Sequence, residues 1–323
     1  MKRTARLLCA ISLLLFLAPA PSTLAQSAAT KHKPGLRAGA ATSNITPSIG
    51  GAIIGGFHPF PSTHIHDELH ARCLVLDSGE TRIALVVLDL LGIGREVSDE
   101  ARKLVEKQTG IPATNVLISA THTHSAVSAL GTNRFLINQP LDDYQRFVAQ
   151  RIADGVQRAV NQLEPARIGW AVDEEPRQVF NRRWFMKPGT VPVNPFGEFD
   201  QVKMNPQRAS KDLDRPAGPT DPQVTVLAVQ SLDGRPIGAY ASYSLHYVGG
   251  VGNGHISADY YGMFCARFSE LLNPPKADAP FVAMLGNGTS GNINNIDFSK
   301  PAVSQPPYTK MREVAEDVAQ AAL

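Results

Sequence analysis

Apolar residues along this chain gather in short runs that end at turn-forming residues. The runs at residues 70–78 and 82–92 meet at a Ser-Gly-Glu turn, and those at residues 223–231 and 236–244 flank an Asp-Gly pair. Each pair predicts a β-hairpin, because two strand-like runs joined by a short glycine-containing turn tend to fold back on each other. Further strand-like runs lie at residues 116–120, 166–172 and 281–286.

Helices are predicted between these strands. The segment 98–110 begins with Ser98 as a candidate N-cap and stops at Gly110, which are the usual start and stop signals. Other helical patterns cover residues 142–163, residues 259–272 and the chain from about Thr309 onwards. Residues 177–222 are rich in proline, asparagine and glycine and predict a long irregular loop, a feature that is often functional.

This mixture of elements sets the fold class. Strands and helices are interspersed and hairpins are present, which favours an α/β fold with a mixed β-sheet core and flanking helices over a purely parallel sheet. The length allows one large domain or two small ones, and the 43% of hydrophobic residues is enough to build a core.

The N-terminus has the pattern of a secretory signal peptide. Lys2 and Arg3 precede an apolar run at residues 7–17, and the small-x-Ala pattern before Gln26 offers a cleavage site. The alternative, a retained membrane anchor, is disfavoured because the run is too short to span a bilayer. We therefore expect a signal peptide at residues 1–25, a flexible lead at residues 26–35, and a secreted or periplasmic protein.

Charge and cysteine content narrow the function classes. The net charge of +2, without any run of lysine or arginine, argues against a nucleic-acid partner. Cys73 and Cys265 are the cysteines that would remain after signal cleavage. Export permits them to pair, but each lies in an apolar segment, so we expect two buried free thiols.

Two of the nine histidines lie at the end of the run at residues 116–120, in the sequence Thr-His-Thr-His-Ser. Residues two apart in a strand project to the same side, so His122 and His124 are expected to face one pocket. Such a pair can ligate a metal, or it can be a hydrogen-bonded pair that fills a polar gap. His246 also ends an apolar run, and is a further candidate ligand; His255 is a weaker one.

Four other histidines cluster in the segment 58–70 without a strand to fix them. His58, His64, His66 and His70 are interpreted as loop and strand-start structure.

Several motifs occur in the order found in one protein family. They are AGAATSNITP, IHDELHARCLVLD, ISATHTHSA, FNRRW, SLHYVGGVGNGHISADYYG and GNGTSGNIN, and they cover residues 36–295. In this respect the chain resembles the neutral/alkaline ceramidases. The resemblance implies a secreted or membrane-facing zinc amidase that cleaves the amide of ceramide into sphingosine and a fatty acid.

The resemblance also implies roles for individual residues. His122 and His246 match zinc ligands, and His124 matches the neighbouring catalytic or substrate-orienting histidine. Arg182 matches an active-site arginine, which could hold an oxyanion or a carboxylate product; the alternative is a solvated loop arginine. The expected mechanism has zinc polarise the carbonyl and activate a water, while His124 passes a proton to the leaving amine.

Two departures from the family pattern affect this expectation. Asn294 stands where the family has a serine, and Ser290 aligns with that serine only after a shift, so attack by water or by Ser290 stays open. The family's glutamate in a Pro-Gly-Glu motif has no counterpart after Asn295, and Tyr308 and Glu313 are weak substitutes. The chain also ends within a helical pattern. We therefore expect residues 36–323 to be a truncated ceramidase-like catalytic domain.

The predicted function is an exported zinc-dependent amidohydrolase. Its expected partners are a ceramide-like lipid or another small amide, and transient contact with a membrane surface. Two alternatives stay open: a zinc hydrolase of another small amide or ester on the same scaffold, and a non-catalytic exported binding module.

Overall fold

A computed structural model describes residues 35–56, 58–130, 140–272, 274 and 279–323. The predicted signal peptide lies outside the described residues, as does the predicted flexible lead except for Gly35. No helix in the described part of the chain has the length and apolar character needed to cross a membrane.

Within residues 34–323, an eight-stranded mixed sheet organises the chain, and this confirms the predicted fold class. Its spatial order is β16-β14-β13-β8-β1-β5-β6-β7. The pairs β14–β16 and β6–β7 are parallel and the others are antiparallel. The strands are β1 (Arg37–Asn44), β5 (His70–Asp77), β6 (Arg82–Leu88), β7 (Val116–Ala120), β8 (Glu164–Glu174), β13 (Gln223–Ser231), β14 (Pro236–Tyr243) and β16 (Val282–Asn287). Both predicted hairpins, β5–β6 and β13–β14, are present.

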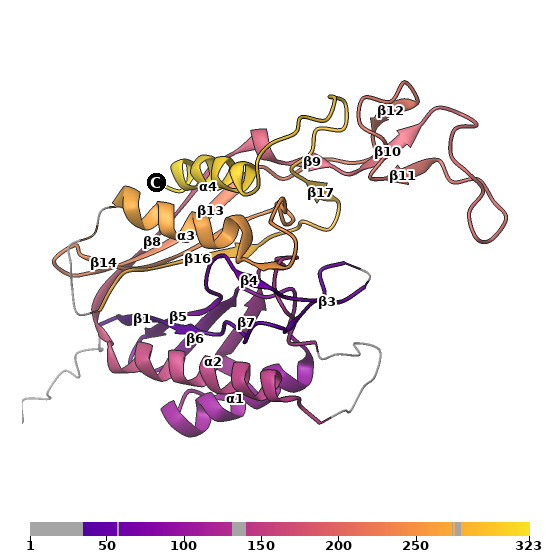
Figure 1. The fold of residues 1–323 in the computed structure, drawn as a ribbon. Coiled ribbons are helices and arrows are strands. Elements are labelled where there is room, and N and C mark those ends of the chain that lie inside the picture. The colour runs from indigo at the N-terminus through magenta and orange to yellow at the C-terminus, as the bar shows by residue number, and fades with distance from the viewer. Residues whose placement is uncertain (1–34, 57, 131–139, 273, 275–278) are drawn as a thin grey trace, which may run out of the picture. The chain divides into compact units, whose positions relative to one another are not determined.

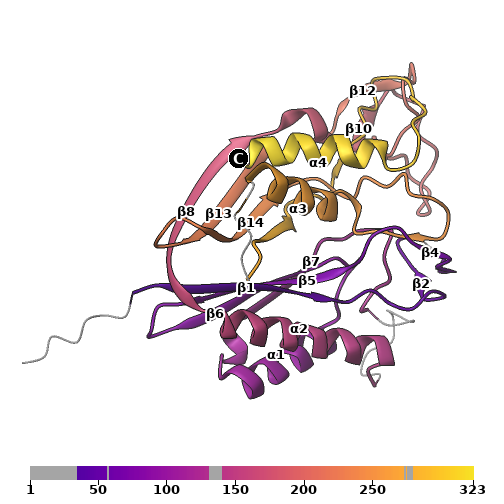
Figure 2. The ribbon, with the colours of Figure 1, turned by 60° about the vertical axis from the view of Figure 1, so that its left-hand side comes forward.

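The sheet folds over itself where β8 meets β1. These two strands share only the pairs Arg37↔Pro165 and Ala38↔Glu164, so the two halves of the sheet can turn and face each other. Apolar side chains such as Leu74 from one half and Met284 from the other fill the space between them. Figures 1 and 2 show the resulting four layers, with a pair of helices outside each half of the sheet.

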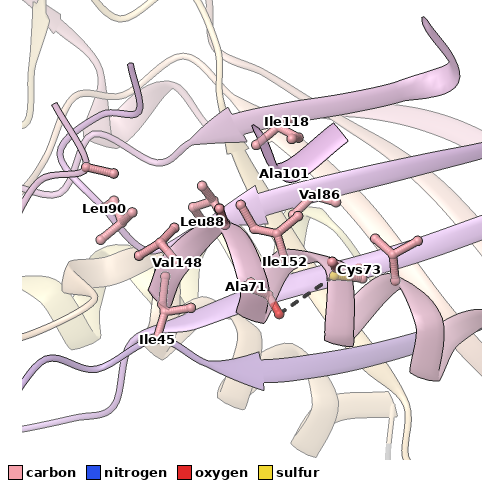
Figure 3. Close-up of a cluster of buried hydrophobic side chains, with 14 of the residues drawn as sticks. Ile45, Ala71, Cys73, Val86, Leu88, Leu90, Ala101, Ile118, Val148 and Ile152 are labelled. Carbon is pink, nitrogen blue, oxygen red and sulfur yellow. Dashed lines mark hydrogen bonds between the residues drawn. The ribbon is translucent and has the colours of Figure 1, made fainter. Parts of the chain in front are cut away.

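The helices cover the outer faces of the two halves. The first half is covered by α1 (Arg95–Thr109) and α2 (Asp143–Asn161), and the second by α3 (Asp259–Leu272) and α4 (Thr309–Ala321). Figure 3 shows Val148 and Ile152 of α2 packed over β5 and β6. Cys73 lies in this core and Cys265 in the core beneath α3, and both are free and buried, as expected.

The helix boundaries follow the sequence signals except at one end. Asp142 caps α2 through a reciprocal pair of hydrogen bonds with Gln145. The prediction that α1 begins after Ser98 is wrong. Its N-cap is Gly94, and the Ser98 backbone N–H donates to the Gly94 carbonyl at 3.0 Å, which places Ser98 inside the first turn. The helix ends at Gly110, whose φ of 71° is left-handed, as a glycine cap allows.

The prediction of one irregular loop over residues 177–222 is also wrong. The segment contains β9 (Phe180–Asn181), β10 (Arg183–Met186), β11 (Val202–Met204) and β12 (Leu213–Pro216). The last three form a separate antiparallel sheet in the order β11-β10-β12. These strands are too short to show a clear period, and the Pro- and Gly-rich connections dominate the composition. Shorter pairings link β2 (Ala52–Ile53) to β3 (Phe60–Pro61), β4 (His64–Ile65) to β15 (His255–Ile256), and β9 to β17 (Ile293–Asn294).

Candidate metal centre

His122 leaves the sheet through a left-handed turn. Strand β7 ends at Ala120, and the φ of His122 is 69°, a conformation that costs a non-glycine residue about 1–2 kcal/mol. The backbone N–H of His122 donates to the Leu90 carbonyl at 3.0 Å, which ties this turn to the end of β6. The expectation that the side chains of His122 and His124 meet is confirmed, but strand alternation is not the reason. The left-handed turn at His122 brings them together.

The ring tautomers of His122 and His246 are fixed by backbone carbonyls. His122 Nδ1 lies 2.8 Å from the Leu91 carbonyl oxygen, and His246 Nδ1 lies 3.1 Å from that of Ser290. A carbonyl only accepts, so in both rings Nδ1 carries the proton and Nε2 keeps its lone pair. This is the arrangement by which proteins usually orient a metal-ligating imidazole.

The three rings converge at one point. His122 Nε2 and His124 Nε2 are 3.2 Å apart, and one ligand atom from each of His122, His124 and His246 lies within 4.8 Å of the others. His246 reaches the cluster from the segment that follows β14. Three histidine nitrogens are a donor set that is found in catalytic zinc sites. The cluster could thus hold a metal ion.

Burial keeps two of these imidazoles neutral. Desolvation, and then the neighbouring His122, His246 and Arg182, lower the pKa of His124 to about 3. Desolvation also lowers the pKa of His246 to about 4, although its hydrogen bond to Ser290 opposes that shift. A metal ligand must be unprotonated, so both groups are ready to donate a lone pair at neutral pH.

Residues 257–259, which are distant in sequence, hold both the turn after His246 and residues 121–125, which we call the histidine loop. The Thr123 hydroxyl donates to the Ser257 carbonyl at 3.1 Å, and the Ser257 N–H donates to the Ser125 carbonyl at 2.8 Å. The buried carboxylate of Asp259 accepts from the N–H groups of Val248 and Gly249, which fixes the turn that follows His246.

Two supporting residues were missed by the sequence analysis. The Tyr247 ring stacks on His124 with centroids 3.7 Å apart and planes inclined by 13°. A Cβ placed on Gly55 would lie 2.2 Å from the His124 carbonyl oxygen, so only glycine allows the backbone at Gly55 to approach the histidine loop this closely. Adjacency to His246 was an available signal for Tyr247. No local signal marked Gly55.

Arg182 lies beside the cluster. Its guanidinium donates to the Gly291 carbonyl through Nε at 3.0 Å and through an Nη atom at 2.7 Å. Its positive charge is close enough to contribute to the low pKa values of His124 and His246. Desolvation in turn lowers the pKa of Arg182. The side chain is thus held at the site rather than free in solvent.

Ser290 and Asn294 occupy different positions around the cluster. Ser290 is buried, and its hydroxyl lies 3.5 Å from His246 Nδ1, on the opposite side of that ring from Nε2. Asn294 is in β17, where its side-chain carbonyl accepts from the Ile296 N–H at 3.1 Å. The hydrogen bonds described for Asn294 do not reach a histidine.

The remaining candidates lie outside the cluster. His255 pairs with His64 across β15 and β4, with ring centroids 4.5 Å apart, and contacts the Tyr308 hydroxyl. Glu313 lies in α4, where Lys310 donates to it at 2.7 Å. Among the described residues, Glu313 does not join the three histidines, and Tyr308 contacts His255 and stacks on His66.

Fold and site together define a mixed α/β protein with a three-histidine candidate metal centre at the ends of its strands. A family model described as neutral/alkaline non-lysosomal ceramidase, N-terminal, matches residues 37–300. The chain belongs to this family.

Individual relatives are distant. The chain is 25% identical over 240 residues to neutral ceramidase B of Dictyostelium discoideum, which covers 71% of this chain and 31% of the relative. It is 24% identical over 268 residues to neutral ceramidase A of the same organism, a match that covers 79% of this chain and 34% of the relative.

Two solved structures share the fold. One, described as a ceramidase complexed with C2, has a TM-score of 0.67 at 20% identity and covers 90% of this chain and 43% of its own. The other, neutral ceramidase from Pseudomonas aeruginosa, has a TM-score of 0.63 at 19% identity. This match covers 90% of this chain and 44% of the solved chain. The chain thus spans less than half the length of the relatives and structures it matches.

Proposed function

We propose that this protein is an exported metal-dependent amidohydrolase that cleaves the amide of a ceramide-like lipid, with zinc as its metal. The observation that carries the proposal is the pair His122 and His246, whose Nδ1 atoms are bound by backbone carbonyls and whose rings converge with that of His124. Family membership supports the amide chemistry. The N-terminal sequence pattern supports export.

His122 and His246 would hold the metal through Nε2. When bound, zinc would polarise the amide carbonyl and make a water acidic enough to attack at neutral pH. His124, which burial keeps unprotonated, would take up a proton from the nucleophile and deliver it to the leaving amine. Tyr247 would keep the His124 ring in position by stacking on it.

Arg182 would bind negative charge that develops on the substrate. Its bonds to the Gly291 carbonyl hold the guanidinium near His124 and His246, and a planar cation suits either an oxyanion or the carboxylate product. Water is the proposed nucleophile. Asn294 has no nucleophilic atom, and the Ser290 hydroxyl lies on the Nδ1 side of His246, away from the converging Nε2 atoms.

A second candidate follows from the same asparagine. Asn294 replaces the serine expected from the family pattern, and this change favours a different specificity. Hydrolysis of a smaller polar amide or ester would use the same metal, His124 and Arg182. A non-catalytic binding module is the remaining alternative.

The test is metal analysis of the purified protein together with a substrate panel. We expect bound zinc by mass spectrometry, loss of that zinc in His122→Ala and His246→Ala, and unchanged zinc in the control His64→Ala. Turnover of N-acylsphingosines, short N-acyl amines and esters then separates the substrate classes. Metal-free wild-type protein after gentle purification would contradict the proposal, and bound zinc without any turnover would favour a binding module.

A further inference from the structure

A small three-stranded sheet forms an arm that projects away from the four layers. The arm consists of residues 183–216, with β10 at its centre and β11 and β12 on either side. Figure 1 shows it extending beyond β9 and β17, with a long connection between β10 and β11. That connection ends in a tight turn, residues 193–199, which we call the arm tip.

The arm tip is an ordered hairpin. Val193 and Phe199 form an antiparallel bridge. Between them the Asn194 side-chain carbonyl accepts from the N–H groups of Phe196 and Glu198, both at 3.0 Å. The Asn194 N–H donates to the Glu198 carbonyl at 2.7 Å, and Gly197 adopts a φ of 89° that favours glycine. This network fixes Phe196 at the apex of the turn.

Three apolar side chains at the arm tip face solvent. Phe196 is 91% exposed, Phe199 71% and Val193 51%. Burying such aromatic side chains stabilises by a few kcal/mol each, so a fixed turn that exposes them suggests a surface to which they bind.

The base of the arm is joined to the candidate metal centre. The Arg182 N–H donates to the Asn292 carbonyl at 2.8 Å, and the Asn205 N–H donates to the Arg182 carbonyl at 2.7 Å. Arg183 Nε also donates to the Asn292 side chain at 2.8 Å. The strand that leads into the arm therefore also positions Arg182 beside the histidines.

We infer that the arm tip inserts into the interfacial region of a lipid bilayer and holds the metal centre near the membrane surface. This inference rests on the proposed function, because an amide of a ceramide-like lipid lies at that depth. A convex tip with two aromatic side chains can enter between lipids, whereas a stable protein interface needs about 1,200–2,000 Å² of matched surface.

The charges on the arm indicate which lipids it should bind. Exposed cations lie elsewhere on the arm. Lys187 and Lys203 are exposed, while Arg215 is paired with Asp214 and Arg183 with the Asn292 side chain. Glu198 lies in the tip, and Asp200 directly follows it and accepts from the Asn194 amide at 3.1 Å. These carboxylates oppose both deep insertion and attraction to anionic lipid. We therefore expect shallow binding to which zwitterionic phosphatidylcholine is sufficient.

Co-sedimentation with phosphatidylcholine vesicles tests the inference. We expect the full chain to bind, and the double variant Phe196→Ser/Phe199→Ser to bind at least about tenfold more weakly. Trp170→Ser is the matched control, since Trp170 is 77% exposed on β8 and belongs to no part of the arm. A wild-type protein that stays in the supernatant, or a double variant that binds as well as wild type, would overturn the inference.

A spectroscopic variant gives an independent measurement. In Phe196→Trp, the emission of the added indole is obtained by subtracting the wild-type spectrum. This emission should shift to the blue when vesicles are added and should be quenched by brominated lipids. Unchanged emission would contradict insertion. If the wild type self-associates without binding vesicles, and the double variant does not self-associate, the partner of the arm tip is a second copy of the chain.

Neither readout needs turnover, so failure of the proposed amidase activity would be recognised separately. If the activity is present, the double variant should lose turnover of vesicle-borne substrate and keep turnover of a short soluble amide.

Discussion

His122 Nε2 and His124 Nε2 lie 3.2 Å apart, although the strand that leads to them has already ended at Ala120. Two neutral imidazoles can be this close when one donates to the other, or when both face one cation. The Nδ1–H of His122 donates to the Leu91 carbonyl, so the Nε2 atom of the neutral ring carries no proton. Any proton between the two Nε2 atoms must therefore belong to His124. This asymmetry suggests different roles for the two histidines.

His124→Ala should separate those roles. If His124 transfers protons and does not ligate the metal, the variant should keep most of its zinc and lose activity by about 10²–10⁴-fold. Zinc content and turnover measured on the same preparation decide the matter. Loss of both together would make His124 a third ligand, and the proton transfer would then need another group.

Ser290→Ala and Asn294→Ala test the nucleophile. The backbone carbonyl of Ser290, rather than its hydroxyl, makes the closer contact with His246, so we expect Ser290→Ala to keep zinc and substantial activity. Asn294→Ala should cost about 10–1000-fold if its amide contacts the carbonyl or oxyanion of the substrate. An inactive Ser290→Ala protein of intact zinc content, with an acyl adduct trapped on Ser290 of the wild type, would contradict attack by water.

The sequence identified those parts of the site whose signals are local. His122, His124 and His246 each follow an apolar run, and that placement alone marked them as candidates. The ends of α3, at Asp259 and Leu272, were likewise predicted without change. A local signal was not always sufficient, because the N-cap pattern at Ser98 placed the start of α1 too late, and the helix begins at Arg95.

Features that depend on distant contacts were not predictable in this way. The left-handed turn at His122 is held by the Leu90 carbonyl, which belongs to another part of the chain. The arm strands β10, β11 and β12 are stabilised by pairing with each other rather than by an apolar period. In each case the cause is a contact between segments that are separated in sequence.

Asp259 should make stability depend on pH. Burial raises the pKa of this carboxyl to about 6, against an ordinary value near 4, while hydrogen bonds from the N–H groups of Tyr260, Gly249 and Val248 oppose the shift. Between these two pH values the folded state binds more protons than the unfolded state. The contribution of Asp259 is therefore most favourable below about pH 4 and is lost as the pH rises through about 6, by about 3 kcal/mol.

Asp259→Asn removes this titration. The free energy of unfolding of wild type minus that of the variant should therefore fall by about 3 kcal/mol from pH 3 to pH 7. Denaturant unfolding at several pH values measures the difference. A difference that stays constant across this range would show that Asp259 does not titrate there in the folded state.

Gly55→Ala should disrupt the histidine loop from outside it. The added methyl carbon would lie 2.2 Å from the His124 carbonyl oxygen and 2.5 Å from its Cα, distances at which the backbone must move. Because His124 is also stacked on Tyr247, a shift of its backbone would separate the three imidazoles. We expect weaker zinc binding and a large loss of activity.

The neighbouring glycine provides the matched control. A Cβ on Gly56 would meet no atom within 4 Å, so Gly56→Ala makes the same chemical change next in sequence without the clash. Zinc affinity by competitive chelation, turnover and the free energy of unfolding should all be close to wild type in Gly56→Ala. In Gly55→Ala, zinc affinity should fall even in preparations whose far-ultraviolet circular dichroism shows a folded chain. Equal zinc affinity in the two variants would mean that the loop tolerates the displacement, and that the close approach of Gly55 to His124 does not set the geometry of the metal centre.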